Sequence, residues 1–299
     1  MSIIEQATKR LEQLRQAGID VPWQQGGKPA QATGAAAPGQ MPARPAAAAR
    51  TTQAGSGRTS RSVTLDLPSL SKRLLVPGNE LMELAAEFRS IKRPLVANVS
   101  HATAGSTVGS NLIVVTSAVQ GEGKTFCAVN LALSMAAEVD RTVLLVDADI
   151  LRPSVGSRLG IDSRTGLLDL LSDPNLDVSD VLLKTNVPKF TVLPAGVPRP
   201  DSAELLAGGH MKELFHELSQ RYPDRIIVVD APPLLPTSEA RTLASRAGQV
   251  LMVVDAGATS QSLVSQAFAA LEGNPNVMAV LNRRSELLRN YASGYGYGE

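Results

Sequence analysis

The sequence predicts an α/β fold in which a mostly parallel sheet is covered by helices on both faces. Short apolar runs rich in Val, Ile and Leu alternate with helical patterns over most of the chain. Several of these runs are continuously apolar, as expected for strands buried on both faces, and such alternation is typical of a parallel sheet. The expected strands are 112–116, 143–146, 190–193, 226–229, 250–254 and 277–281, and the expected helices include 124–137, 211–221 and 260–272.

Composition sets broad limits on what the protein does. The 299 residues are 43% hydrophobic and 19% charged, which suits a globular core. A net charge of +1 argues against a nucleic-acid binder that works through bulk charge. The single cysteine, Cys127, excludes a disulfide framework and a cysteine-built zinc site. The chain shows no apolar run of 18 residues and no secretory leader, so no membrane span is expected.

Two segments precede the expected globular domain. Residues 1–23 predict an amphipathic helix, because apolar side chains recur near helical spacing at Ile3, Ile4, Ala7, Leu11 and Leu14. This helix is either solvated or a docking element for a partner protein or a membrane surface. Residues 24–62 are rich in Ala, Pro and Gly and predict a disordered tether, since they offer little apolar surface to bury.

The globular domain is expected over residues 63–289. It should open with a helix at 79–96, which Pro94 is expected to stop because proline lacks the backbone N–H that a helix needs. Residues 290–299 form a glycine-rich tail, NYASGYGYGE, which holds three of the four tyrosines of the chain. One interpretation of this tail is a disordered, adhesive end without a specific function.

The first expected strand of the alternating region runs directly into a glycine-rich loop, AVQGEGKT at 118–125, and then into a helix. This is the phosphate-loop pattern, with Ala118 in place of its first glycine. Gly121 and Gly123 let backbone N–H groups turn toward one anion, and the helix adds its positive N-terminal end. Lys124 is expected to reach the β- and γ-phosphates of ATP, and the Thr125 hydroxyl to ligate Mg²⁺.

Acidic residues follow two other expected strands. Asp147 and Asp149 come after 143–146, at the sheet edge that also carries the phosphate loop, where open parallel sheets bind ligands. They suggest Mg²⁺ organisation or acceptance of a proton from a nucleophile, although Asp149 could instead cap a helix. Asp230 ends an IIVVD run in the Walker B pattern, whose carboxylate holds Mg²⁺. Asp255 is expected to be a turn residue.

The residues predicted to bind the nucleotide come from the phosphate loop, from the start of the helix that follows it, and from one distant position. They are Gly121, Glu122, Gly123, Lys124, Thr125, Phe126 and Asn282. Asn282 follows the last expected strand, where its amide could hydrogen-bond an adenine edge.

Taken together, SAVQGEGKT, LLVDAD, IIVVDAPP, LPAG at 193–196 and the tyrosine-rich tail resemble the bacterial tyrosine kinases of polysaccharide export. That family belongs to the phosphate-loop branch of the partition and septum-placing ATPases. The N-terminal IEQATKRLEQL, the Ala/Pro tether and EFRSIKRPL are similar to its exosortase-associated autokinase subgroup.

The resemblance implies an ATP- and Mg²⁺-dependent autokinase that regulates exopolysaccharide synthesis. Lys124, Asp147 and Asp149 would be catalytic, and Thr125, Asp147 and Asp230 would hold the metal. The acceptors would be Tyr291, Tyr295 and Tyr297. The resemblance also implies a homo-oligomer, activated at the inner face of the plasma membrane by the cytoplasmic part of a membrane chain-length-determinant protein. Which of Asp147 and Asp149 is the base is left open.

Two departures from the family pattern matter. The second acidic motif of the family runs Asp-x-Asp-x-Arg, whereas here position 151 is leucine and the arginine is Arg152. The oligomerisation helix of the family carries Glu-x-x-Arg-x-x-Arg. Here Arg89 fits, Lys92 replaces the second arginine, and position 86 is Ala86 with Glu87 beside it. Two alternatives to a kinase stay open: a partition-type positioning ATPase and a nucleotide-gated scaffold. A positioning ATPase gives no reason for clustered tyrosines.

Overall fold

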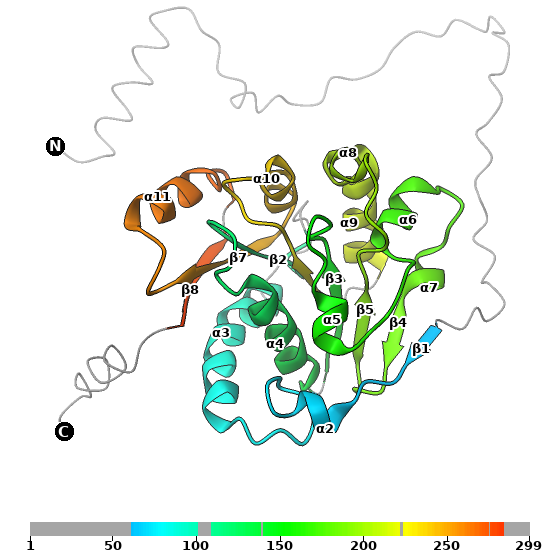
Figure 1. The fold of residues 1–299 in the computed structure, drawn as a ribbon, viewed down its shortest axis with the longest axis horizontal. Coiled ribbons are helices and arrows are strands. Elements are labelled where there is room, and N and C mark those ends of the chain that lie inside the picture. Colours follow the sequence, from blue (N-terminus) through cyan, green and yellow to red (C-terminus); the bar gives the residue numbers. More distant parts are fainter. Residues whose placement is uncertain (1–60, 101–108, 139, 222–223, 275, 284–299) are drawn as a thin grey trace, which may run out of the picture. The chain divides into compact units, whose positions relative to one another are not determined.

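The computed structural model describes residues 61–100, 109–138, 140–221, 224–274 and 276–283 (Figure 1). Within these residues an eight-stranded sheet has the order β1-β4-β5-β3-β6-β2-β7-β8. All neighbouring strands are parallel except β4 and β5. The strands are β1 (Arg61–Val63), β2 (Leu112–Ser117), β3 (Thr142–Asp147), β4 (Leu183–Thr185), β5 (Phe190–Leu193), β6 (Arg225–Asp230), β7 (Gln249–Asp255) and β8 (Val277–Asn282).

Helices cover both faces of this sheet. Helices α2 to α5 lie on one face and α6 to α11 on the other (Figure 1). The first group is α2 (Leu67–Leu70), α3 (Met82–Ser100), α4 (Lys124–Ala136) and α5 (Val155–Leu159). The second group is α6 (Leu167–Ser172), α7 (Val178–Val181), α8 (Ser202–Ala207), α9 (Gly209–Arg221), α10 (Ser238–Ser245) and α11 (Gln261–Ala269).

The side chains of the central strands pack into two separate hydrophobic cores, one on each face of the sheet. In β2, Leu112 and Val114 pack into the cluster under α6 to α11, whereas Ile113 and Val115 pack into the cluster under α2 to α5. Because successive side chains of a strand point to opposite faces, a strand between two helix layers must be apolar throughout. The predicted fold class and the six predicted strands are therefore confirmed.

The prediction that Pro94 stops the first helix is wrong, because α3 continues through it to Ser100. A proline inside a helix loses one backbone hydrogen bond. Contacts beyond Pro94 favour continuation: Leu95 is buried in the core, and the Asn98 side chain donates to Gln249 Oε1 at 2.9 Å. Tertiary packing therefore overrides the local signal.

The short strands β1 and β4 were not predicted, and β1 starts inside the segment expected to be a tether. The residues after β1 belong to the core, because Leu65, Leu74 and Val76 are buried against α4. Asn130 of α4 accepts a hydrogen bond from the Leu75 backbone N–H at 2.9 Å. The expected N-terminal helix, residues 24–60 of the tether and the tail lie outside the described residues. Within the described ranges, no helix is both long enough and apolar enough to span a bilayer.

Candidate active site

The phosphate loop lies between β2 and α4, as the sequence predicts. Gly121 and Gly123 have φ values of 89° and 94°, in the left-handed region that only glycine enters readily. A Cβ atom at Gly123 would also collide with the side-chain amide of Asn282. Ala118, which replaces the first glycine of the pattern, is fully buried beneath the loop. The loop therefore tolerates alanine at its start but requires glycine at its turn.

The strands that end in Asp147 and Asp230 lie on one side of β2, the strand that carries the loop, with β6 between β3 and β2. Strand β6 pairs with β2 on one side and with β3 on the other, and Asp147 lies directly opposite Asp230 in the register. The carboxyl ends of parallel strands meet at one edge of the sheet. The topology thus brings Asp147, Asp230 and the start of α4 to one place, as predicted.

Only one of the two carboxylate oxygens of Asp147 has hydrogen-bond partners among the described residues. Its Oδ2 accepts backbone N–H bonds from Ser154 at 3.1 Å and Val155 at 3.0 Å, whereas its buried Oδ1 has no partner among the described residues. The Ser154 hydroxyl donates to Thr125 Oγ1 at 3.0 Å, so the start of α5 orients both side chains. Ser154 was not predicted from the sequence, where its only signal is that a serine precedes the segment that forms α5.

Asp230 is fully buried, and neither of its carboxylate oxygens has a hydrogen-bond partner among the described residues. Burial raises its pKa to about 6, against the opposing effects of the Lys124 charge and of the nearby Thr125 hydroxyl. Burial and the neighbouring Asp230 charge raise the pKa of Asp147 to about 8. Two adjacent buried carboxylates without sufficient compensation are costly, which a bound cation would relieve.

These oxygen atoms fit Mg²⁺, which prefers oxygen ligands and usually takes one or two carboxylates together with phosphate and water. The oxygens without a hydrogen-bond partner among the described residues are Asp147 Oδ1 and both oxygens of Asp230, and the Thr125 hydroxyl lies near Asp230. In the described part of the chain, no group of three or more His, Cys, Asp or Glu side chains is placed to hold a metal ion. Two carboxylates and one hydroxyl therefore form the candidate metal site.

Asp149 forms an ion pair with Lys124, and both side chains are buried. Helix α5 begins at Val155 with Ser154 at its N-cap, so Asp149 does not cap that helix. The Asp149 carboxylate also accepts a 3.3 Å bond from the Arg152 N–H. In this state the phosphate-loop lysine is neutralised by a carboxylate that a nucleotide phosphate would have to replace.

Glu122 and Asn282 have protein partners that the sequence did not reveal. The Glu122 carboxylate accepts from the backbone N–H of Val119 at 2.7 Å and of Asp255 at 3.2 Å. Asn282 Nδ2 donates to the Glu122 carbonyl at 2.8 Å, and its Oδ1 accepts from the Arg283 N–H. An adenine contact by Asn282 stays a prediction, and it requires exchange of one of these bonds.

The side chains of Phe126 and Asp255 contact other protein groups that fix their positions. The Phe126 ring meets that of Phe88 edge to face, with centroids 6.3 Å apart. Phe126 and Asn282 both line a hollow of about 540 Å³ between α3, α4 and β8. Asp255 accepts from the Gly257 N–H at 3.0 Å and pairs with Arg283 at 2.8 Å, as expected for a turn residue.

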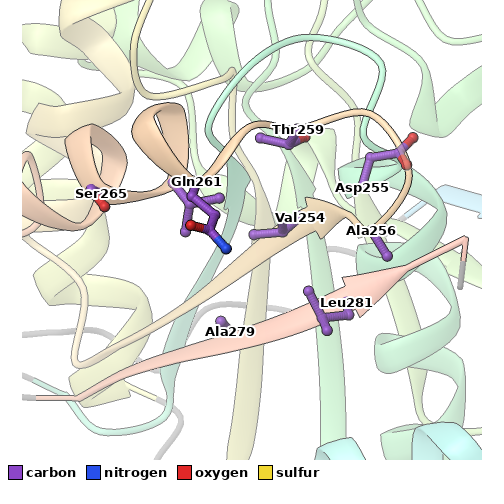
Figure 2. A pocket seen from close by; sticks show the side chains of 9 residues that line it. Val254, Asp255, Ala256, Thr259, Gln261, Ser265, Ala279 and Leu281 are labelled. Atoms are coloured by element: carbon purple, nitrogen blue, oxygen red, sulfur yellow. The ribbon is translucent and has the colours of Figure 1, made fainter. Parts of the chain in front are cut away.

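A second hollow, of about 450 Å³, lies on the other face of β8. Figure 2 shows Gln261 and Ser265 of α11 across from Ala279 and Leu281 of β8, with Asp255 at the end of β7 and Thr259 in the loop that connects β7 to α11. The lining contains no residue of the phosphate loop, but the Thr259 hydroxyl donates to Glu122 of that loop. This hollow therefore adjoins the nucleotide site through the loop between β7 and α11.

Fold and site together define a phosphate-loop nucleotide-binding domain. A family described as an AAA domain matches residues 110–272, more than half of the chain. The tyrosine-protein kinase YwqD of Bacillus subtilis is 31% identical over 204 residues, which are 68% of this chain and 82% of YwqD. The tyrosine-protein kinase CpsD of Streptococcus agalactiae is 30% identical over 194 residues, which are 64% of this chain and 82% of CpsD. The chain belongs to the family of bacterial tyrosine-protein kinases.

Solved structures agree with this assignment. The kinase domain of VpsO is 29% identical with a TM-score of 0.57, and the match covers 68% of this chain and 98% of that domain. The kinase domain of the Escherichia coli tyrosine kinase ETK is 25% identical with a TM-score of 0.61, and the match covers 76% of this chain and 85% of that domain. Some relatives are much longer: the chain spans 30% of AmsA from Erwinia amylovora and 19% of EpsB from Ralstonia solanacearum. The shared part is the nucleotide-binding domain.

Proposed function

We propose that this chain is an ATP-dependent protein-tyrosine autokinase of the exosortase-associated subgroup, which phosphorylates its own C-terminal tyrosines and regulates exopolysaccharide polymerisation or export. The observation that carries the proposal is a phosphate loop whose lysine, threonine and three aspartates meet at one sheet edge. The tyrosine-rich tail follows in sequence soon after β8, whose last residue, Asn282, is bonded to that loop.

The residues divide the work of binding and transfer. Backbone N–H groups of the loop and the start of α4 face the phosphates. Lys124 exchanges its partner Asp149 for the γ-phosphate, where its charge stabilises the transferring group. Thr125, Asp147 and Asp230 hold Mg²⁺, which when bound neutralises phosphate charge and organises the phosphates for displacement.

Asp149 is the base in this proposal. The unpartnered oxygens of Asp147 and Asp230 would hold the metal, which leaves the carboxylate beside Lys124 to accept a proton. A phenol has a pKa of about 10, so its attack on phosphorus needs a proton acceptor. The phenol proton passes to Asp149 and the phenol oxygen bonds to the γ-phosphorus. The bond from that phosphorus to the β–γ bridging oxygen breaks, and ADP leaves.

Acceptor tyrosines belong to a neighbouring copy of the chain in this proposal. Tyr295 and Tyr297 alternate with three glycines, and Tyr291 lies four residues before Tyr295; the glycines give the tail freedom to enter a partner's site. Each phosphate adds a charge of about −1.5 to −2. Accumulated charge would repel the acidic site, so the modified tail should leave and the oligomer should loosen.

Partners follow from the resemblance and from the surface of α3. Arg89 and Glu87 lie on the exposed side of this helix, in keeping with a homo-oligomer contact. Lys92, at the position of the second family arginine, is instead held by α4: it donates to the Ser134 carbonyl at 2.9 Å and pairs with Glu138 at 2.6 Å. We place the activator, the cytoplasmic part of a membrane chain-length-determinant protein, at the inner face of the plasma membrane, with residues 1–60 as tether and docking segment.

A complementation experiment tests transfer between copies. A full-length Lys124→Ala chain is mixed with an otherwise intact chain that lacks residues 291–299, and Mg-ATP is added. Phosphotyrosine on the tail of the Lys124→Ala chain, mapped by mass spectrometry, is the expected result. The matched control is a Lys124→Ala chain in which Tyr291, Tyr295 and Tyr297 are phenylalanine, and it should gain no phosphate.

Three outcomes would contradict parts of the proposal. An unmodified tail in the mixture, when the wild-type chain modifies itself, would refute transfer between copies. Phosphate only outside 291–299 would refute the acceptor assignment. ATP hydrolysis by the wild-type chain without any phosphotyrosine would favour a partition-type ATPase instead.

A further inference from the structure

The phosphate loop contains a buried acidic residue that the proposed chemistry does not use. The Glu122 side chain is 2% exposed, and its carboxylate accepts hydrogen bonds from three donors. One donor is the Val119 N–H of the same loop, at 2.7 Å to Oε2. The other two donate to Oε1: the Asp255 N–H, at 3.2 Å, from the last residue of β7, and the Thr259 hydroxyl from the loop that follows this strand.

Further bonds join this cluster to the end of the last strand. Asn282 Nδ2 donates to the Glu122 carbonyl at 2.8 Å, and its side chain packs where a Cβ of Gly123 would lie. Arg283 pairs with Asp255 at 2.8 Å. Asp255 is the last residue of β7, and Thr259 lies in the loop that follows this strand (Figure 2). The phosphate loop, the loop after β7 and the end of β8 are thus linked through Glu122.

The donor pattern requires a carboxylate at this position. A carboxylate only accepts hydrogen bonds, and here both oxygens face N–H or O–H donors. An amide in its place would turn an NH₂ group toward at least one N–H donor and leave that donor buried without a partner, which is costly. Bonds to a charged acceptor are also stronger than bonds between neutral groups, so the loop is held firmly.

We infer that Glu122 is a positioning residue: its carboxylate holds the loop 118–123 in the curve that presents backbone N–H groups to phosphate, using Thr259 and Asp255 as fixed points. The side chain acts through the loop and does not itself ligate the nucleotide. The inference rests on the proposed binding of nucleotide at this loop. It makes phosphate affinity depend on Thr259, a residue on another loop, which no phosphate-loop pattern would include.

The test measures ADP affinity directly, by calorimetric titration of the full chain without Mg²⁺, and thermal unfolding in parallel. Glu122→Gln keeps the shape and should weaken ADP binding by about tenfold or more, the effect of losing a charged hydrogen bond. Thr259→Val removes one donor at constant shape and should weaken it about fivefold. Thr259→Ser keeps the hydroxyl and should bind like wild type. Glu213→Gln, on the exposed surface of α9, is the matched control and should also bind like wild type.

Each outcome decides the inference. A fall in ADP affinity in Thr259→Val that Thr259→Ser restores supports it, since a role in stability alone would lower the unfolding temperature of the folded variant without changing affinity. Folded Glu122→Gln and Thr259→Val chains that both bind ADP within twofold of wild type overturn it. If Glu122→Gln does not fold, the Thr259 pair decides alone. A wild-type chain that binds ADP but makes no phosphotyrosine contradicts the kinase proposal and leaves this inference standing, whereas failure to bind ADP overturns both.

Discussion

Replacement of Asp230 by asparagine should make the metal-free protein more stable while removing its response to Mg²⁺. Both oxygens of Asp230 are buried without a hydrogen-bond partner among the described residues, and its pKa is raised to about 6 by burial. A raised pKa means that the folded protein holds this proton more tightly than the unfolded chain. Ionisation therefore lowers the free energy of unfolding as pH rises from about 4 to about 6, and above that range the loss is complete.

The size of the effect follows from that pKa. The model value for aspartate is 3.8, so the folded pKa lies about two pH units higher. Each unit corresponds to 1.36 kcal/mol, which gives about 3 kcal/mol at pH 8. Asparagine is neutral at every pH and avoids the cost of ionisation, and the desolvation of its buried amide offsets only part of that gain. Loss of the Asp230 charge also removes one cause of the raised pKa of Asp147, an effect of the same sign.

Thermal and urea unfolding of wild type and Asp230→Asn, from pH 4 to pH 8 in EDTA, measures the difference. At pH 8 the variant should unfold about 6–12 °C higher, given about 2–4 °C for each kcal/mol in a domain of this size. With ADP and Mg²⁺, wild type should gain about 2.7 kcal/mol at a hundredfold excess over Kd. The variant should respond to ADP alone but gain nothing more from Mg²⁺. Asp162→Asn, at an exposed site, is the control and should match wild type.

Either of two results would refute this reasoning. A variant that is less stable than wild type at pH 8 in EDTA would show that Asp230 has favourable partners, so the buried charge would not be the uncompensated one. A variant that is still stabilised by Mg²⁺ beyond ADP alone would show that Asp230 does not belong to the metal site.

Lys124→Ala should abolish phosphotyrosine, scored by immunoblot, and cost about 3–5 kcal/mol in urea unfolding because it leaves Asp149 buried without its partner; retained phosphotyrosine would contradict the loop assignment. Deletion of residues 1–60 should leave ADP affinity and the unfolding temperature unchanged and remove only recruitment to membranes, seen by fractionation of cells. Deletion of 1–76 removes buried Leu and Val side chains and should lower the unfolding temperature by more than 10 °C, and equal stability of the two deletions would contradict the core described above.

Much of the fold and of the chemical centre was predictable from the sequence. Strands buried between two helix layers must be apolar throughout, so β2, β3, β6 and β7 appear as continuous runs. The glycines of the phosphate loop reflect a backbone with positive φ, and the aspartates mark strand ends. Each of these signals is local, because it depends on the conformation of a few consecutive residues.

The tertiary structure alone decided the contacts between distant segments. Nothing local shows that Asp147 lies opposite Asp230, that Ser154 orients Thr125, or that Glu122 is fixed by Thr259, 137 positions later in the chain. Pro94 is the converse case, in which a strong local stop signal is outweighed by packing of the helix beyond it. The order of the strands and the packing of the loops bring these residues together. Their interaction energies therefore arise only in the folded structure. Local propensity alone could not have found these contacts.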